Sequence, residues 1–270
     1  MTEQDQKIIE LYQNGLSGVK IAKQLNITNG VVYSCLERHK IPRRSNKINS
    51  VKYSVNHDYF EVIDTEEKAY WLGFMYADGF VTCRNNVGLS LGEKDYNHLV
   101  KFKNCLQATN PIKKYTVSNG FTEGSIYYRL LVTSDKMKQD LIKYGCVEQK
   151  TDILIAPNIN KNLQKHFIRG YIDGDGCITR SLIDKKYQYK IKICGTDAIL
   201  QYIADFIQEN NIATIHKFYK RKEGQTVSYI DFGGNIQVIN FLNLVYGNSN
   251  IYLDRKYNIY LEACEQIKNI

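Results

Sequence analysis

Two aspartates, Asp78 and Asp175, occupy the same local setting at distant points of the chain. Each follows an apolar run with helical spacing and precedes a glycine, Gly79 or Gly176, which can adopt the left-handed conformation that ends a helix. The pattern predicts a carboxylate at the carboxyl end of each helix, where the helix dipole disfavours unpaired negative charge. Side by side, two such carboxylates predict a site for a divalent cation such as Mg²⁺, which suits phosphodiester hydrolysis.

Small residues on the same two helices predict that the aspartates come together. Gly73 and Ala77 are four positions apart in the first helix, and Gly170 and Gly174 are four apart in the second. Each pair therefore lies on one helix face, and two such faces can pack closely. A single Asp-Gly pair is a common turn, but two copies at the ends of two similar helices favour a shared site.

The segments that follow the two helices match each other in type and order. Alternating apolar and polar residues predict strands in both halves, at 87–91, 126–132, 187–193 and 227–232. Helical periodicity predicts helices in both halves, at 95–106, 135–144, 197–210 and 235–246. We therefore expect an α+β fold in which each half has the order αββαββ with a closing helix. The repeats span 56–160 and 161–270, and their period of about 100 residues indicates a duplicated domain.

Residues 1–42 predict a small all-α domain of three short helices. The first helix covers 4–14, and Ser17 and Thr28 are expected to cap the second and third. The chain carries a net charge of +8, and its first 55 residues hold nine Lys or Arg against four Asp or Glu, so this end is the most basic part. Residues 43–55 contain few apolar residues and several charges, which predicts a basic linker.

The two aspartate helices resemble the paired motif of the LAGLIDADG homing endonucleases. One copy is Trp71-Leu-Gly-Phe-Met-Tyr-Ala-Asp-Gly79, and the other is Ile168-Arg-Gly-Tyr-Ile-Asp-Gly-Asp-Gly176. The resemblance covers roughly 56–270 and implies two saddle-like antiparallel sheets. The first copy has Tyr76 where the family usually has Asp, which the second copy keeps as Asp173. This difference suggests that the two halves are not equivalent.

The same resemblance implies roles for individual residues. Asp78 and Asp175 would bind the metals, assisted by the carbonyls of Ala77 and Gly174. Family sites also keep a lysine late in each repeat, and the best-placed candidates for this second pair of catalytic residues are Lys150 and Lys256. Glu93 is a further candidate neighbour of the water or the metal.

The implied partner is double-stranded DNA, which basic side chains would contact through its phosphates. Alternation in Tyr187–Ile193 places every second residue away from the core and towards DNA. The amino-terminal helices resemble a helix-turn-helix, whose third helix would carry the contacts. The predicted DNA contacts are Thr28, Asn29, Tyr33, Ser34, Arg38, Arg43, Arg44, Arg84, Asn85, Asn86, Lys113, Lys114, Arg180, Gln188, Lys190, Lys192, Lys217, Lys220 and Arg221.

The composition predicts a folded, soluble protein of the cytoplasm. Apolar residues make up 43% of the 270 positions, which is enough for one domain of ordinary size and a small one. The seven cysteines form no C-x-x-C pair, which favours reduced thiols over a disulfide framework or a zinc site. No apolar run approaches the length of about 18 residues that a membrane span requires. A prokaryotic or phage origin is expected, with an organelle as the alternative.

The leading hypothesis is a site-specific homing endonuclease of a mobile genetic element. It would use Mg²⁺ to hydrolyse both strands of a long duplex, and the resemblance implies short 3′ overhangs; Ca²⁺ would occupy the site without supporting cleavage. Because duplication supplies both halves of the site, a monomer without an obligatory protein partner is expected. The sequence leaves three alternatives open: a catalytically silent DNA-binding regulator, an RNA maturase, and a strand-specific nickase suggested by Tyr76.

Overall fold

The computed structural model describes residues 1–43, 52–120, 122–183, 186–215, 217–220 and 226–268. Its contacts divide the chain into two units, Met1–Tyr53 and Ser54–Ile270. The first unit holds three helices, α1 (Glu3–Gln13), α2 (Gly18–Leu25) and α3 (Asn29–Arg38), which pack around a small apolar core of their own. None of the helices in the described residues is both long and apolar enough to cross a bilayer.

The second unit repeats one order of elements twice. Its first half consists of α5 (Glu66–Ala77), β1 (Gly79–Val81), β2 (Asn86–Gly92), α6 (Tyr96–Cys105), β3 (Lys113–Thr116), β4 (Ile126–Thr133) and α7 (Asp135–Lys143). Its second half consists of α8 (Gln164–Asp175), β5 (Gly176–Ile183), β6 (Lys186–Gly195), α9 (Asp197–Glu209), β7 (Tyr219–Lys220), β8 (Ser228–Gly233) and α10 (Asn235–Tyr246), followed by α11 (Asp254–Lys268). The predicted α+β duplication with the order αββαββα is confirmed.

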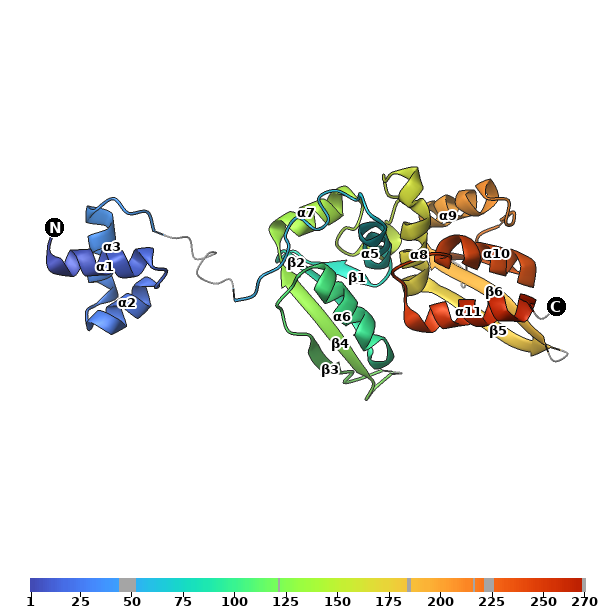
Figure 1. The fold of residues 1–270 in the computed structure, drawn as a ribbon, viewed down its shortest axis with the longest axis horizontal. Helices are drawn as coiled ribbons and strands as arrows, with labels where there is room; N and C mark the ends of the chain where they lie inside the picture. The colour runs from blue at the N-terminus through green and yellow to red at the C-terminus, as the bar shows by residue number, and fades with distance from the viewer. Residues whose placement is uncertain (44–51, 121, 184–185, 216, 221–225, 269–270) are drawn as a thin grey trace. The chain divides into compact units, whose positions relative to one another are not determined.

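Each half contains a four-stranded antiparallel sheet, with the order β1-β2-β4-β3 in the first and β5-β6-β8-β7 in the second. Buried residues face one another across paired strands: Leu89 pairs with Leu130, and Ile193 pairs with Ile230. Helices cover this apolar face, and Figure 1 shows α6 along the first sheet and α11 along the second. Residues at the alternate positions project from the opposite face of each sheet.

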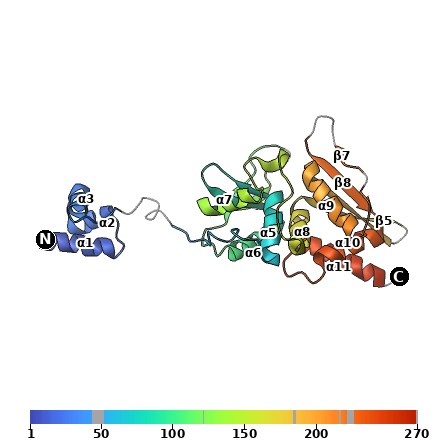
Figure 2. The same ribbon diagram turned by 90° about the horizontal axis from the view of Figure 1, so that it is seen from above.

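Helices α5 and α8 lie side by side at the centre of the second unit, as both Figure 1 and Figure 2 show. Gly73 lies against the carbonyl of Phe167, and Gly170 lies against the carbonyl of Tyr70. A Cβ atom at either glycine would overlap backbone of the opposite helix. The small residues therefore form the helix contact that the sequence predicts, and the ends of the two helices are held together.

The backbone conformation of the glycines that follow α5 and α8 differs from the prediction. Gly176 has φ −83° and ψ 154°, and neither it nor Gly79 is among the described glycines with positive φ. Each instead begins a strand directly after the helix. A Cβ at Gly79 would lie 2.7 Å from the Cα of Met75, and one at Gly176 would lie 2.6 Å from the carbonyl oxygen of Ile172. Glycine is needed here for space, because the chain turns back tightly on its own helix.

A buried ion pair joins the two halves at the opposite end of α5. Arg169 is 1% exposed and donates to Glu66 Oε1 at 2.7 Å, to the carbonyl of Val245 at 2.7 Å and to the carbonyl of Ile251 at 2.8 Å. These partners come from α5, α10 and the segment before α11, and His166 of α8 adds a contact to the guanidinium at 3.0 Å. All seven cysteines are free thiols, as the sequence predicts.

Candidate active site

The two motif aspartates stand at the ends of the paired helices. Asp78 is the residue after α5, and Asp175 is the last residue of α8. Both side chains are open to solvent on one side, but packing around the helix ends removes part of their hydration. This desolvation raises the pKa of both carboxyls, and the charge of Asp78 helps to raise that of Asp175 to about 6. Two carboxylates that repel each other in this way favour a bound cation.

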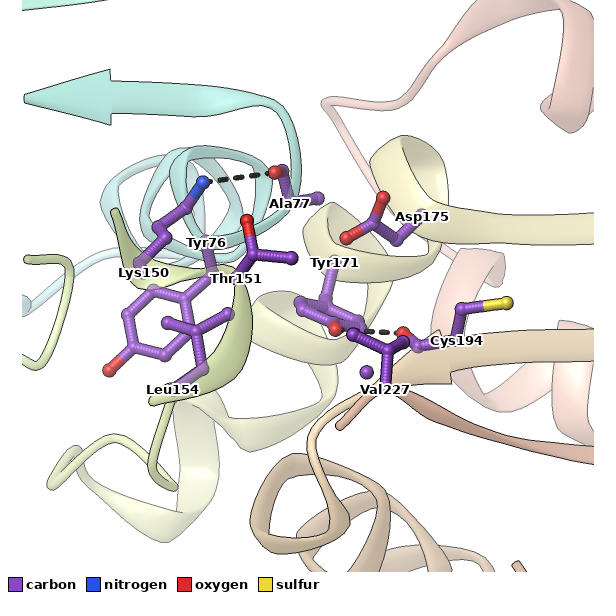
Figure 3. A pocket seen from close by; sticks show the side chains of 10 residues that line it. Tyr76, Ala77, Lys150, Thr151, Leu154, Tyr171, Asp175, Cys194 and Val227 are labelled. Atoms are coloured by element: carbon purple, nitrogen blue, oxygen red, sulfur yellow. Dashed lines mark hydrogen bonds between the residues drawn. The ribbon is translucent and has the colours of Figure 1, made fainter. Parts of the chain in front are cut away.

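Lys150 reaches the end of α5 from the 3₁₀ turn η2 (Lys150–Asp152). Its Nζ donates to the carbonyl of Ala77 at 3.1 Å and to that of Gly79 at 2.6 Å. Figure 3 shows the amine beside Ala77, with Asp175 projecting from the end of α8. Among the cations that lower the pKa of Asp175, Lys150 has the largest effect. The ammonium therefore offsets both the α5 dipole and the carboxylate of the other half.

Lys256 occupies the matching position at the end of α8. It is 3% exposed, and its Nζ donates to the carbonyls of Ile172 at 2.6 Å, Asp173 at 2.8 Å and Gly176 at 2.6 Å. Burial lowers its pKa to about 8, although the charge of Asp173 opposes that change. Among the cations that lower the pKa of Asp78, Lys256 has the largest effect. Among the cations, the lysine of the opposite half thus has the largest effect on the pKa of each carboxyl.

A cavity of about 170 Å³ lies between the two halves beside these groups. It is large enough for a few water molecules, since a water occupies about 30 Å³ in the liquid. The residues around it come from both halves: Tyr76, Ala77, Lys150, Thr151, Leu154, Tyr171, Asp175, Cys194, Gly195 and Val227. Asp175, Lys150 and Ala77 therefore line one cavity. Asp78 lies beside Gly174, where an added Cβ would be 3.4 Å from its Oδ2, and Lys256 acts on Asp78 through its charge.

Asp95, which the sequence analysis did not select, lies closer to this chemistry than Glu93. Glu93 is exposed in the 3₁₀ turn η1 (Glu93–Asp95). Asp95 is 9% exposed, accepts hydrogen bonds from Arg255 Nε at 3.0 and 3.2 Å, and raises the pKa of Asp78 through its charge. Asp95 directly precedes α6, which is a usual place for a capping aspartate, so the sequence offered no sign of this pairing.

The outer face of the second sheet carries three of the predicted DNA contacts, Gln188, Lys190 and Lys192. They alternate along β6 with buried residues such as Ile191, as predicted. Lys190 forms an ion pair with Asp231 at 2.5 Å, and the Nζ of Lys192 lies 3.5 Å from the ring centroid of a neighbouring tyrosine. Lys217 and Lys220 are also exposed, whereas Arg221 lies outside the described residues.

Three predicted contacts lie on the other side of their sheets, and one of them is Lys220, which pairs with the buried Ser228. Arg180 pairs across the strands with buried Tyr189 and forms an ion pair with Glu262 of α11, so it belongs to the helix-covered face. Lys114 pairs with Tyr128, which packs against the core, while its neighbour Lys113 shares the outer face. Strand register, which the sequence did not fix, separates these residues from the outward set. The contacts Arg84, Asn85 and Asn86 lie at the β1–β2 turn.

Arg129, which was not among the predicted contacts, lies on the outer face of the first sheet. Its Nε donates to Ser90 Oγ at 2.8 Å. Its guanidinium lies 5.3 Å from the ring centroids of Phe80 and Tyr115 and 5.6 Å from that of Tyr127. Alternation with buried Leu130 would have indicated its direction. The surrounding rings hold the guanidinium in place while it faces outward.

In the first unit, part of the predicted DNA-binding set is engaged internally. Arg38 pairs with Asp5 at 3.2 Å, and His39 also contacts this carboxylate at 3.2 Å. The hydrogen bond from His39 is the largest of the effects that hold the pKa of Asp5 well below its usual range. Asp5, Cys35 and His39 bring three metal-binding atom types within 4.8 Å, but the Asp5 carboxylate is already occupied by these partners.

The remaining predicted contacts of the first unit surround α3. Arg43 lies over the ring of Tyr33, 4.8 Å from its centroid. Thr28 occupies the cap position before α3, although its side chain makes no capping hydrogen bond. Arg44 lies outside the described residues. The exposed members of the set on this helix and its cap are Thr28, Asn29, Ser34 and Arg38.

No protein-family model and no curated protein sequence matches the chain. Solved structures similar to it include the LAGLIDADG meganuclease I-AabMI bound to uncleaved DNA, with a TM-score of 0.48, 11% identity, and 73% of this chain and 88% of that chain covered. The LAGLIDADG homing endonuclease I-GzeII in complex with its DNA target has a TM-score of 0.47 and 14% identity, over 73% and 88% of the chains. The LAGLIDADG homing endonuclease I-SmaMI bound to cleaved DNA has a TM-score of 0.46 and 13% identity, over 76% and 89%.

Proposed function

We propose that this chain is a metal-dependent endonuclease that hydrolyses a specific double-stranded DNA site as a monomer. The observation that supports this most is the meeting of Asp78 and Asp175 at the ends of two helices, each with a lysine beside it. A protein that only bound DNA would gain nothing from two clustered carboxylates beside phosphates, because like charges repel. Cleavage of both strands, short 3′ overhangs and a role in the mobility of its own gene are the finer parts of this proposal.

The donor set at the helix ends fits Mg²⁺. This ion prefers a site with one or two carboxylates and room for several water molecules. Here the two carboxylates repel each other, which favours a bound cation. Asp78 and Asp175 would hold it, with the carbonyl of Gly174; the carbonyl of Ala77 already accepts a hydrogen bond from Lys150 and keeps one lone pair. A bound Mg²⁺ would activate water and offset negative charge on the phosphate.

Within the described contacts, only one of the two lysines has a hydrogen left to act on the phosphate as well as on a helix end. An ammonium has three hydrogens, and Lys256 uses all three on carbonyls. Lys150 makes two such bonds among the described residues and lines the cavity. Its third hydrogen would donate to a phosphate oxygen as negative charge develops. This difference favours unequal cleavage of the two strands, and a nickase is the second candidate.

DNA would be bound by the outer faces of the two sheets. Lys113, Arg129, Lys190 and Lys192 project from these faces, and the major groove is wide enough to admit antiparallel strands. We further propose that the three amino-terminal helices form a helix-turn-helix DNA-binding module. Joining two DNA-binding modules through residues 43–55 would raise affinity, because the second binds at a high effective concentration.

The proposal is tested by incubating the wild-type chain with a randomised duplex library and Mg²⁺, followed by sequencing of the cut ends. Specific cuts are expected, and Asp78→Asn and Asp175→Asn should abolish them. Asp64→Asn is a matched control, since Asp64 is an exposed carboxylate paired with Lys68, and it should leave cleavage intact. Tight, specific duplex binding without any cleavage would contradict the endonuclease and favour the regulator.

A further inference from the structure

The sixth residue of each aspartate motif is buried and makes a contact that the proposed chemistry does not explain. In α8 this residue is Asp173, which is 1% exposed. It accepts hydrogen bonds from Tyr70 Oη at 2.7 Å, Tyr246 Oη at 2.5 Å and the backbone nitrogen of Leu253 at 2.8 Å. Leu253 directly precedes α11, and its carbonyl accepts from the backbone nitrogen of Lys256 at 3.0 Å. Asp173 therefore fixes the start of the segment that carries Lys256.

In α5 the matching residue is Tyr76, which is fully buried. Its hydroxyl donates to the carbonyl of Tyr144, in the turn between α7 and Lys150. The next residue, Gly145, has φ +97°, and a Cβ there would lie 2.5 Å from the Tyr76 hydroxyl. A second bond, from Cys146 Sγ to the carbonyl of Met75 at 3.5 Å, fastens the same turn to α5. The turn is therefore built around the tyrosine.

We propose that Tyr76 is a positioning residue for Lys150 and does in the first half what Asp173 does for Lys256 in the second. This inference rests on the proposed function. The two contacts have opposite polarity, because Tyr76 donates to a carbonyl and Asp173 accepts from an amide. Tyr76 thus takes the place of the motif aspartate and uses a different hydrogen-bond partner. The first half keeps Lys150 in place without that aspartate.

Opposite polarity predicts that restoring the usual aspartate does harm. In Tyr76→Asp the shorter side chain would not reach the carbonyl of Tyr144, so this acceptor would lose its donor and a carboxylate would be left in buried space. Tyr76→Phe removes only the hydroxyl and keeps the packing of the ring against Phe167, whose centroid is 5.0 Å away. Tyr76→Phe is therefore the informative variant, and Tyr76→Asp is expected to be the more severe one.

The first experiment measures how accessible each lysine is, without DNA. The full chain is treated with a water-soluble acetylating ester, and the acetylation rates of Lys150 and Lys256 are followed by mass spectrometry. Tyr76→Phe should raise the rate at Lys150 about fivefold, the scale of one lost hydrogen bond, and leave Lys256 unchanged. The control is Tyr202→Phe, because Tyr202 packs on the same Phe167, and it should change neither rate. An unchanged rate at Lys150 in Tyr76→Phe overturns the inference.

The second experiment follows the two strands of the library-selected duplex, each with its own label, in single-turnover cleavage. Tyr76→Phe and Lys150→Met should slow the same strand, and Lys256→Met should slow the other. Duplex affinity should stay unchanged in Tyr76→Phe, because the lysine is mispositioned and not removed. Equal slowing of both strands by Tyr76→Phe contradicts the inference. Absence of cleavage by the wild type refutes the proposed function alone, since the acetylation experiment still decides whether Tyr76 positions Lys150.

Discussion

Replacing Gly170 by alanine tests whether contact between α5 and α8 limits both stability and the site. The added Cβ would overlap the carbonyl oxygen of Tyr70 and lie 2.8 Å from its carbonyl carbon and 2.9 Å from the nitrogen of Phe74. Carbon contacts normally begin near about 3.5 Å, so the helices must separate by more than about 0.6 Å. Because the neighbour is backbone and cannot rotate away, we expect a loss near the upper end of overpacking effects, about 3 kcal/mol.

The assay is urea unfolding of the wild type, Gly170→Ala and the control Gly92→Ala, since a Cβ at Gly92 meets open space. A loss of about 3 kcal/mol corresponds to a Tm lower by roughly 6–12 °C for a unit of this size, with an unchanged urea m-value. Gly92→Ala should stay within about 0.5 kcal/mol of the wild type. The double variant with Gly73→Ala and Gly170→Ala should lose little more stability than Gly170→Ala alone, because that substitution has already separated the helices. A Gly170→Ala protein as stable as the control would refute the close-contact argument.

Four further measurements follow from the described contacts. Without metal, the free energy of unfolding of Asp175→Asn should come to exceed that of the wild type by about 1 kcal/mol as pH rises from about 4 to 7. The raised pKa of Asp175 makes its ionisation in the folded state unfavourable, and the solvent-exposed side of the carboxyl reduces this cost. Equal pH profiles of the two proteins would contradict this. At pH 7, Mg²⁺ should raise the Tm of the wild type and not that of Asp175→Asn. Arg169→Met should cost about 3–5 kcal/mol in urea unfolding, since Glu66 would lose its buried partner, and a cost below 1 kcal/mol would count against it. Lys192→Gln should reduce the slope of log affinity against log salt by about 0.9 in fluorescence titrations of duplex DNA, and an unchanged slope would place Lys192 away from phosphates.

Local patterns predicted the order of the elements and the two aspartates because each depends on neighbouring residues. Helical spacing and the repeated Asp-Gly pair are visible within about a dozen positions, and the duplication allowed one half to support the other. The lysines followed from the resemblance and not from any local signal. Their contacts with the helix ends, such as Lys256 with the carbonyl of Ile172, join residues far apart in the chain.

Predictions that depended on strand register or on long-range ion pairs were the ones that differed. Alternation gives two faces to a strand, but which face is covered depends on its partners, so the sequence did not show that Arg180 lies on the helix-covered face. Glu93 and Asp95 differ by two positions in a turn, and only the distant Arg255 distinguishes them. Gly79 and Gly176 were identified as special positions, yet their reason is the space beside the helix and not a left-handed backbone.

The crossed electrostatics of the site limits how this duplicated protein can be recombined. Among the cations near the site, Lys256 has the largest effect on the pKa of Asp78, and Lys150 has the largest effect on that of Asp175. A chimaera that takes one half from a relative would therefore exchange one member of each acid–base pair at the same time. Its two half-sites would both be hybrids, so swapping halves to obtain a new binding specificity would also alter the charge balance on which each carboxylate depends.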